Sequence, residues 1–211
     1  MTISKAYISK ESNKLLKDYL KSLNIEVIEV SKNADVSDAI SCHPDVYYCL
    51  LKDRLYEGDP TLLKKEYPGD VLYNAAAVGK YLICSKFTSK DLIKESGLIP
   101  VIVPQGYVKC NLSVLDDHHV ITEDKGIAKV LKDIPDIDCL LINPHEVLLP
   151  GFEYGFIGGA SGRAGNKMIF NGNLKAHSCF GDIRAFCIEC SLDLVYFESY
   201  PLTDIGSIIV V

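Results

Sequence analysis

One stretch of the sequence decides the fold class: KYLICSKFTSKDLIKESGLIPVIV, residues 80–103. Lys80–Cys84 is a short apolar run that is typical of a buried strand. Thr88 is a good N-cap residue, and Asp91 follows it three positions later, so the pair approaches a capping box. Gly97 is a natural residue to end that helix, and Ile99–Val103 predicts a second strand. The stretch therefore predicts a strand, a short helix and a strand, which is the unit of an α/β protein.

The same pattern recurs along the chain. Helices are predicted over residues 10–23, 60–66, 122–131 and 181–190, and strands that follow helices begin near positions 25, 70, 99, 138 and 193. Additional strand-like runs cover residues 46–51, 112–115, 119–122 and 167–170, and the chain ends in an apolar run over 208–211. A doubly wound sheet is the alternative, but the helices are short and no Gly-x-Gly-x-x-Gly follows the first strand. We expect one domain over residues 1–211, built from about five strand–strand–helix–strand units.

Composition restricts the function classes. The 211 residues are 48% apolar and 24% charged, which is ordinary for a globular protein. A net charge of −6 argues against non-specific binding to nucleic acid, since that binding depends on Lys and Arg. No apolar run approaches the roughly 18 residues that a membrane helix needs. The N-terminus does not resemble a signal peptide, so the eight cysteines are expected to be reduced in the cytoplasm.

Three short motifs resemble segments of one superfamily. They are Pro68–Asn74, Gln105–Cys110 and Asp204–Ile209. The first is similar to the Gly-Gly-Asp-Val-Leu segment of dimethylarginine dimethylaminohydrolases, which belong to the guanidine-group-modifying enzymes of the pentein superfamily. Together with the glycine cluster over 154–163, the motifs look most like those of uncharacterised bacterial members of that superfamily.

This resemblance implies a five-bladed α/β propeller whose loops meet at a central channel. The catalytic His of the related enzymes aligns with Tyr107, and their nucleophilic Cys aligns with Ile209 or a neighbour. Ile cannot attack a carbon atom, and a Tyr with an ordinary pKa of about 10 is a poor acid–base group at neutral pH. The resemblance therefore implies a protein that binds a small polar, amino-acid-like or guanidine-like ligand without the standard Cys–His pair.

The candidate ligand contacts are polar residues and glycines that lie near predicted strand ends. Arg163 could hold a carboxylate in two hydrogen bonds, and the glycines beside it could expose backbone N–H groups to an anion. The full set is His43, Asp45, Asn74, Gln105, Tyr107, Lys109, Gly158, Gly159, Ser161, Arg163, His177 and Asp204.

Two other functions stay open. Lys109 is the kind of neighbour that lowers the pKa of a thiol, so Cys110 is the leading candidate for a relocated nucleophile. Cys179, with His177 two residues before it, is the second candidate, and either cysteine would make the protein a hydrolase or amidinotransferase acting on a guanidine or amide. The third function is a non-catalytic module that binds another protein. The apolar C-terminal strand could also mediate a homo-oligomer.

No cofactor or metal site is expected from the sequence. Cys187-x-x-Cys190 has the spacing of a zinc motif, but no second pair accompanies it. His118 and His119 are expected to lie in a turn between two strands. Ser207 has no evident base beside it in the sequence, so we do not expect it to be a nucleophile.

Overall fold

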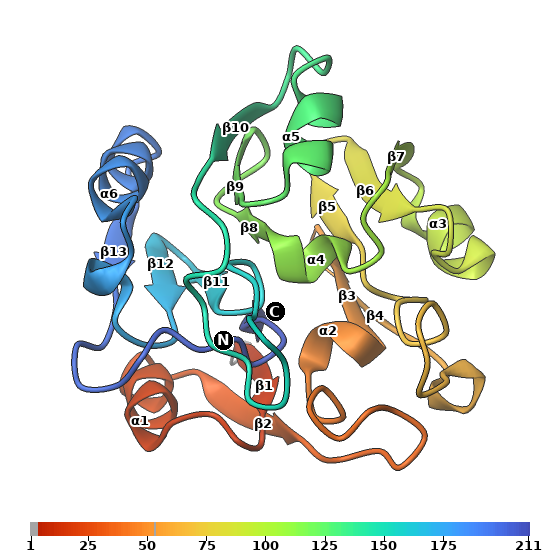
Figure 1. Cartoon of the computed structure of the whole chain (residues 1–211), viewed down its shortest axis with the longest axis horizontal. Helices are drawn as coiled ribbons and strands as arrows, with labels where there is room; N and C mark the ends of the chain where they lie inside the picture. Colours follow the sequence, from red (N-terminus) through yellow and green to blue (C-terminus); the bar gives the residue numbers. More distant parts are fainter. Residues whose placement is uncertain (1–3, 53) are drawn as a thin grey trace.

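The computed structural model describes residues 4–52 and 54–211, so residues 1–3 and 53 of the predicted domain lie outside it. The chain forms a mixed α/β structure in which the described residues make five small sheets, four of three strands and one of two. Figure 1 shows these sheets distributed around the middle of the molecule, with helices α1, α3, α5 and α6 toward the outside.

The stretch over residues 80–103 forms the predicted unit. β5 (Ala76–Val78) pairs antiparallel with β6 (Tyr81–Ser85), and α3 (Lys90–Ser96) returns the chain to β7 (Ile99–Val103), which runs parallel to β6. Ser89, rather than the expected Thr88, is the N-cap, and its hydroxyl accepts from Leu92 N. The Thr88 hydroxyl instead accepts from Ser85 N at 3.0 Å. Gly97 ends the helix in the left-handed region, with φ of 63°.

Two later segments repeat this order and strand direction. The first comprises β8 (Leu112–Val114), β9 (His119–Thr122), α5 (Lys125–Leu131) and β10 (Asp138–Leu141). The second comprises β11 (Ser161–Ala164), β12 (Lys167–Phe170), α6 (Phe180–Glu189) and β13 (Asp193–Val195). The predicted helix over 122–131 begins later than expected, because Asp124, and not Thr122, caps it.

The two ends of the chain together make a fourth unit. β14 (Ile209–Val210) pairs antiparallel with β1 (Lys5–Ser9), and α1 (Lys14–Ser22) leads to β2 (Glu26–Val30), which is parallel to β1. Leu16 and Leu20 of α1 are fully buried with Ile8 in one hydrophobic cluster. Burying this apolar helix face against the sheet stabilises the unit.

The remaining sheet is reduced to a hairpin. β3 (Tyr48–Leu51) and β4 (Arg54–Glu57) pair with each other, and the strand expected near residue 70 is absent from the described residues. In this segment Val71 N donates to Pro68 O at 3.4 Å and Asn74 N donates to Val71 O at 3.2 Å, which are turn contacts and not a strand ladder. The helix expected over 60–66 is also wrong, because only η1 (Pro60–Leu62), one 3₁₀ turn, forms there.

Each sheet is preceded by a loop or a one-turn helix that carries polar residues. α2 (Pro44–Tyr47) comes directly before β3, and α4 (Val108–Asn111) comes directly before β8. Equivalent loops precede the first strand of the other three sheets. Within the described part of the chain, no helix is both long and apolar enough to cross a membrane.

Candidate ligand site

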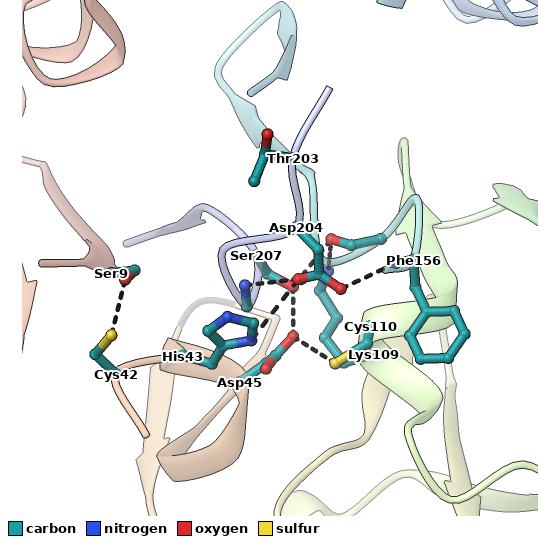
Figure 2. A network of polar contacts seen from close by, with 12 residues as sticks. Ser9, Cys42, His43, Asp45, Lys109, Cys110, Phe156, Thr203, Asp204 and Ser207 are labelled. Carbon is teal, nitrogen blue, oxygen red and sulfur yellow. Dashed lines mark hydrogen bonds and ion pairs between the residues drawn. The ribbon is translucent and has the colours of Figure 1, made fainter. Parts of the chain in front are cut away.

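Five segments that precede the first strands of the five sheets meet in one buried polar network. They contribute Asp45 before β3, Asn74 before β5, Lys109 and Cys110 before β8, Gly158 and Gly159 before β11, and Asp204 and Ser207 before β14. Figure 2 shows Asp204 and Ser207 above His43 and Asp45, with Lys109 and Cys110 alongside. Residues that are up to 162 positions apart in the sequence therefore hydrogen-bond directly.

Lys109 supplies the positive charge of this network. Its ammonium donates to Ser207 Oγ at 3.0 Å, Leu112 O at 3.2 Å and Gly158 O at 3.3 Å. Burial lowers the pKa of Lys109, while the nearby Asp45 carboxylate acts in the opposite direction. An ammonium has three N–H donors, and here each has an acceptor, which is the arrangement of a protonated lysine.

Asp45 is completely buried, and only one of its two carboxylate oxygens accepts hydrogen bonds. Its Oδ2 atom accepts from Ser207 Oγ at 2.8 Å and from Cys110 Sγ at 3.1 Å. Its Oδ1 atom has no hydrogen-bond partner among residues 4–52 and 54–211. Burial raises the pKa of this carboxyl above its ordinary value, because a buried charge loses its hydration.

Cys110 is held in place by hydrogen bonds on both sides. Its thiol donates to Asp45 and accepts from Asn74 Nδ2 at 3.2 Å, while Asn74 Oδ1 accepts from Lys109 N at 2.7 Å. The low thiol pKa expected for Cys110 from its neighbour Lys109 is wrong. Burial and the charges of Asp45 and Asp204 raise the thiol pKa well above its ordinary value, and the Lys109 ammonium bonds to other atoms.

Asp204 forms the other acidic part of the site. Its Oδ1 accepts from Gly206 N at 2.9 Å and its Oδ2 accepts from Phe156 N at 3.0 Å. These bonds favour the ionised form, but burial raises the pKa of Asp204 to about 6. His43 Nδ1 lies 3.7 Å from Asp204 Oδ1, and burial lowers the pKa of His43, so the imidazole is neutral near pH 7.

Two glycines allow this close arrangement. A Cβ atom at Gly159 would lie 2.0 Å from the Asp204 carboxylate, so only glycine leaves room for that side chain. Gly206 has φ of 72°, and a Cβ atom there would lie 2.2 Å from the Cβ atom of His43.

The network borders a cavity of about 280 Å³. His43, Cys110 and Asp204 give it a polar side, while Tyr107 and Phe156 are among the aromatic residues that line it. The remaining lining residues are Ile40, Val46, Leu149, Phe152, Glu153 and Tyr154. A cavity of this size and lining suits a small molecule that has a polar group at one end.

Tyr107 is the predicted ligand contact that contributes an aromatic ring to the cavity. Its hydroxyl donates to Asp70 Oδ2 at 2.5 Å, and its ring lies 6.4 Å from that of Phe156 between centroids. Burial and the Asp70 carboxylate raise the pKa of Tyr107 above its ordinary value, so it remains a protonated hydrogen-bond donor.

The predicted contacts Gln105, Ser161 and Arg163 do not line this cavity. Gln105 Nε2 donates to Asp124 Oδ2 at 3.1 Å, and Ser161 Oγ lies 2.7 Å from Ser113 Oγ, so both brace loops or strands. Arg163 Nη1 donates to Leu115 O at 2.6 Å. Its side chain lines a second cavity, of about 180 Å³, which Lys109 also borders.

His177 and Cys179 form a separate local arrangement before α6. Cys179 N donates to His177 Nδ1 at 3.0 Å, and Cys179 Sγ accepts from Asn143 N at 3.3 Å. The His177 side chain and the Cys179 thiol thus accept hydrogen bonds from backbone N–H groups, and neither residue lines the 280 Å³ cavity.

Sequence reasoning missed the role of Ser207. Its hydroxyl joins the carboxylate of Asp45 to the ammonium of Lys109, although neither residue is near it in the sequence. The aromatic side chains of Phe152, Tyr154 and Phe156 were also missed. Their spacing beside the glycine cluster was the available signal, because alternate aromatic residues in a loop can line a cavity together.

One protein-family model matches the chain, over residues 7–60 and 54–209, and its description is "Family of unknown function (DUF6873)". No curated protein and no solved structure gives a significant match.

Proposed function

The chain belongs to the DUF6873 family, and we propose that it binds a small ligand bearing a guanidinium or amino group in the 280 Å³ cavity. The observation that carries this proposal is the charge of the buried network. Asp45 and Asp204 offer two carboxylates, Lys109 offers one ammonium, and His43 is neutral.

When both carboxylates are ionised, the network has one negative charge in excess. A buried charge without a partner is costly, so the protein either binds a proton or binds a cation. Asp204 lines the cavity directly, where a cationic group could replace the proton that the raised pKa retains. A ligand cation would therefore complete the charge balance.

The aromatic side of the cavity supports the same class of ligand. The aromatic rings of Tyr107 and Phe156 line it, and guanidinium groups bind favourably over the face of an aromatic ring. Methylene groups of an amino-acid-like ligand would contact Ile40, Val46 and Leu149. This combination favours an amino acid or amine with an apolar stem over a sugar or a nucleotide.

We also propose that the five sheets are the blades of a pentein-type α/β propeller. The strand–strand–helix–strand order of four sheets supports it, as does the meeting of five loops at one site. Ile209 pairs with Tyr7 in the β14–β1 ladder, and Tyr107 is a hydrogen-bond donor. Both observations fit a binder that lacks the standard Cys–His pair. All eight cysteines are free thiols, which fits the proposed location in the reducing cytoplasm.

A matched pair of ligands tests the proposal. L-arginine and agmatine carry a guanidinium group, whereas L-citrulline has nearly the same shape as arginine but a neutral group in its place. Thermal-shift and calorimetric titrations should detect binding of a guanidinium compound and little binding of citrulline. Equal affinity for arginine and citrulline, or no binding of any guanidinium or amino compound, would refute the proposal.

Two variants localise the binding. Asp204→Asn should weaken binding of the cation by roughly 30-fold or more, because losing one partner of a buried charge pair costs about 2–5 kcal/mol. Asp133→Asn is the matched control, since Asp133 is an exposed carboxylate and its neutralisation should leave the affinity unchanged.

Cys110 supports a second candidate function, cysteine-dependent cleavage of a guanidine C–N bond. Its thiol lines the same cavity as His43 and Asp204. The sulfur would bond to the guanidinium carbon, the C–N bond would break, and the leaving amine would take the thiol proton. Water would then release a ureido product and restore the thiol. A bound cation beside Cys110 would lower its pKa and favour this attack.

Product analysis separates the two functions. A hydrolase would convert arginine or agmatine to the ureido product, and Cys110→Ala would abolish turnover while retaining binding. If the wild-type protein binds the guanidinium compound and forms no product, the cysteine-dependent reaction is excluded for that compound.

A further inference from the structure

A second group of side chains that could bind a ligand lies where the β8–β10 unit meets the β11–β13 unit, apart from the 280 Å³ cavity. Asp116 is in the turn between β8 and β9, His119 is the first residue of β9, and Cys190 is the C-cap residue of α6. Their ligand atoms all lie within 4.8 Å of one another, and each side chain is partly buried. The group joins residues about 70 positions apart in the sequence.

His119 is held in a fixed orientation. Its Nδ1 atom lies 2.8 Å and 2.9 Å from the two oxygens of Asp116, and its ring meets that of Phe186 edge-on at 5.6 Å between centroids. Asp116 Oδ1 also accepts from the backbone N–H groups of His118 and His119, both at 2.8 Å. Two of the three side chains are therefore already positioned by their mutual contact, by backbone N–H groups and by the Phe186 ring.

The surroundings of Cys190 favour a cation. The carboxylates of Asp116, Glu189 and Asp138 act on the thiol with negative charge, and Arg163 is the neighbouring positive charge. Cys190 also ends a ten-residue helix, whose C-terminus carries partial negative charge. A divalent cation would compensate both this field and the charge of a thiolate.

The donor set and its size suit a borderline transition metal. Imidazole nitrogen, thiolate sulfur and carboxylate oxygen are the ligand types of zinc, which binds at about 2.0–2.3 Å from each. Donor atoms around such an ion are roughly 3–4 Å apart, so 4.8 Å requires only small side-chain movements. Three protein ligands would leave one position for water.

We propose that Asp116, His119 and Cys190 form a zinc-type metal site that clamps the β8–β9 turn to the end of α6. The sequence led us to expect no metal, because Cys187-x-x-Cys190 has no second pair. The fold supplies the missing ligands from the β8–β9 turn instead, and Cys187 is fully buried in the core. The site is distinct from the cavity of the proposed function and does not depend on it.

Cobalt(II) titration of the intact chain under reducing conditions tests the site. The expected result is one bound Co²⁺ with a thiolate-to-metal absorption band, which excess Zn²⁺ removes by displacement. Cys190→Ser and His119→Gln should each lose the band. Cys179→Ser is the matched control, since it removes another partly buried thiol and should retain the band.

A second measurement keeps the proposal testable if a variant folds poorly. Zn²⁺ that binds only the folded state should raise the unfolding temperature of the wild type in proportion to the logarithm of its concentration. Asp116→Asn should lose most of this rise. The proposal is overturned if Co²⁺ gives no thiolate band with the wild type, if the band persists in Cys190→Ser, or if zinc raises wild-type stability no more than that of Asp116→Asn.

Discussion

The buried carboxylate of Asp204 makes the stability of the protein depend on pH in a predictable direction. Its pKa rises from 3.8 to about 6 on folding. Between these two values the folded protein binds more protons than the unfolded chain, so the free energy of unfolding decreases as the pH rises. At about 1.36 kcal/mol per pKa unit, this carboxyl costs the native state roughly 3 kcal/mol above pH 6 relative to below pH 4.

Asp204→Asn isolates this contribution. The amide that this substitution introduces cannot ionise, so the free energy of unfolding of the variant should lack this part of the pH dependence. The amide has one acceptor oxygen for the two N–H groups of Gly206 and Phe156. The missing hydrogen bond should destabilise the variant by about 1–3 kcal/mol at every pH. The informative quantity is therefore the difference between wild type and variant as a function of pH, rather than the absolute stability of either.

Urea unfolding followed by circular dichroism, from about pH 4 to pH 7, measures that difference. The wild type should lose about 3 kcal/mol of unfolding free energy relative to Asp204→Asn across this range. Parallel stability curves for the two proteins would refute the assignment of a raised pKa to Asp204.

Three further predictions concern individual residues. Gly159→Ala should destabilise the fold by about 1–3 kcal/mol in urea unfolding, because the added methyl overlaps the Asp204 carboxylate; an unchanged midpoint would contradict this packing. Tyr107→Phe should lower the free energy of unfolding by about 1–3 kcal/mol, because the buried Asp70 carboxylate loses its Tyr107 donor and its other oxygen has no partner among the described residues. The exposed control Tyr67→Phe should change it little. In the ligand-free protein, iodoacetamide at neutral pH should label Cys110 more slowly than Cys139, since Cys110 is buried with a pKa well above the ordinary value; peptide mass spectrometry showing the reverse would overturn that assignment.

Much of the fold could be predicted because its units have local signals. The apolar runs of β6 and β7 and the left-handed Gly97 identified one complete unit. The strand expected near residue 70 was wrong, because a short apolar run does not reveal that the N–H groups of Val71 and Asn74 bond within a loop. β1 was missed, since its pairing partners include a strand from the other end of the chain.

The candidate site was predictable in its residue types and not in its bonding. His43, Asp45, Asn74, Lys109 and Asp204 come together as expected, because each lies in a segment that precedes a strand. Their hydrogen-bond partners depend on how five loops pack, which the sequence does not encode locally. For this reason the predicted low pKa of the Cys110 thiol is wrong: burial and the charges of Asp45 and Asp204 outweigh the neighbouring ammonium, whose hydrogen bonds go to other atoms.

The pH dependence of ligand affinity shows whether a ligand cation balances the buried carboxylates. Calorimetric titration of agmatine or L-arginine, from about pH 5 to pH 8, should show the dissociation constant falling as the pH rises and levelling off above about pH 6 to 7. The same titration with Asp204→Asn should be weaker and nearly independent of pH. Affinity for the cation that does not change with pH in the wild type, or that equals the affinity for L-citrulline, would contradict the account.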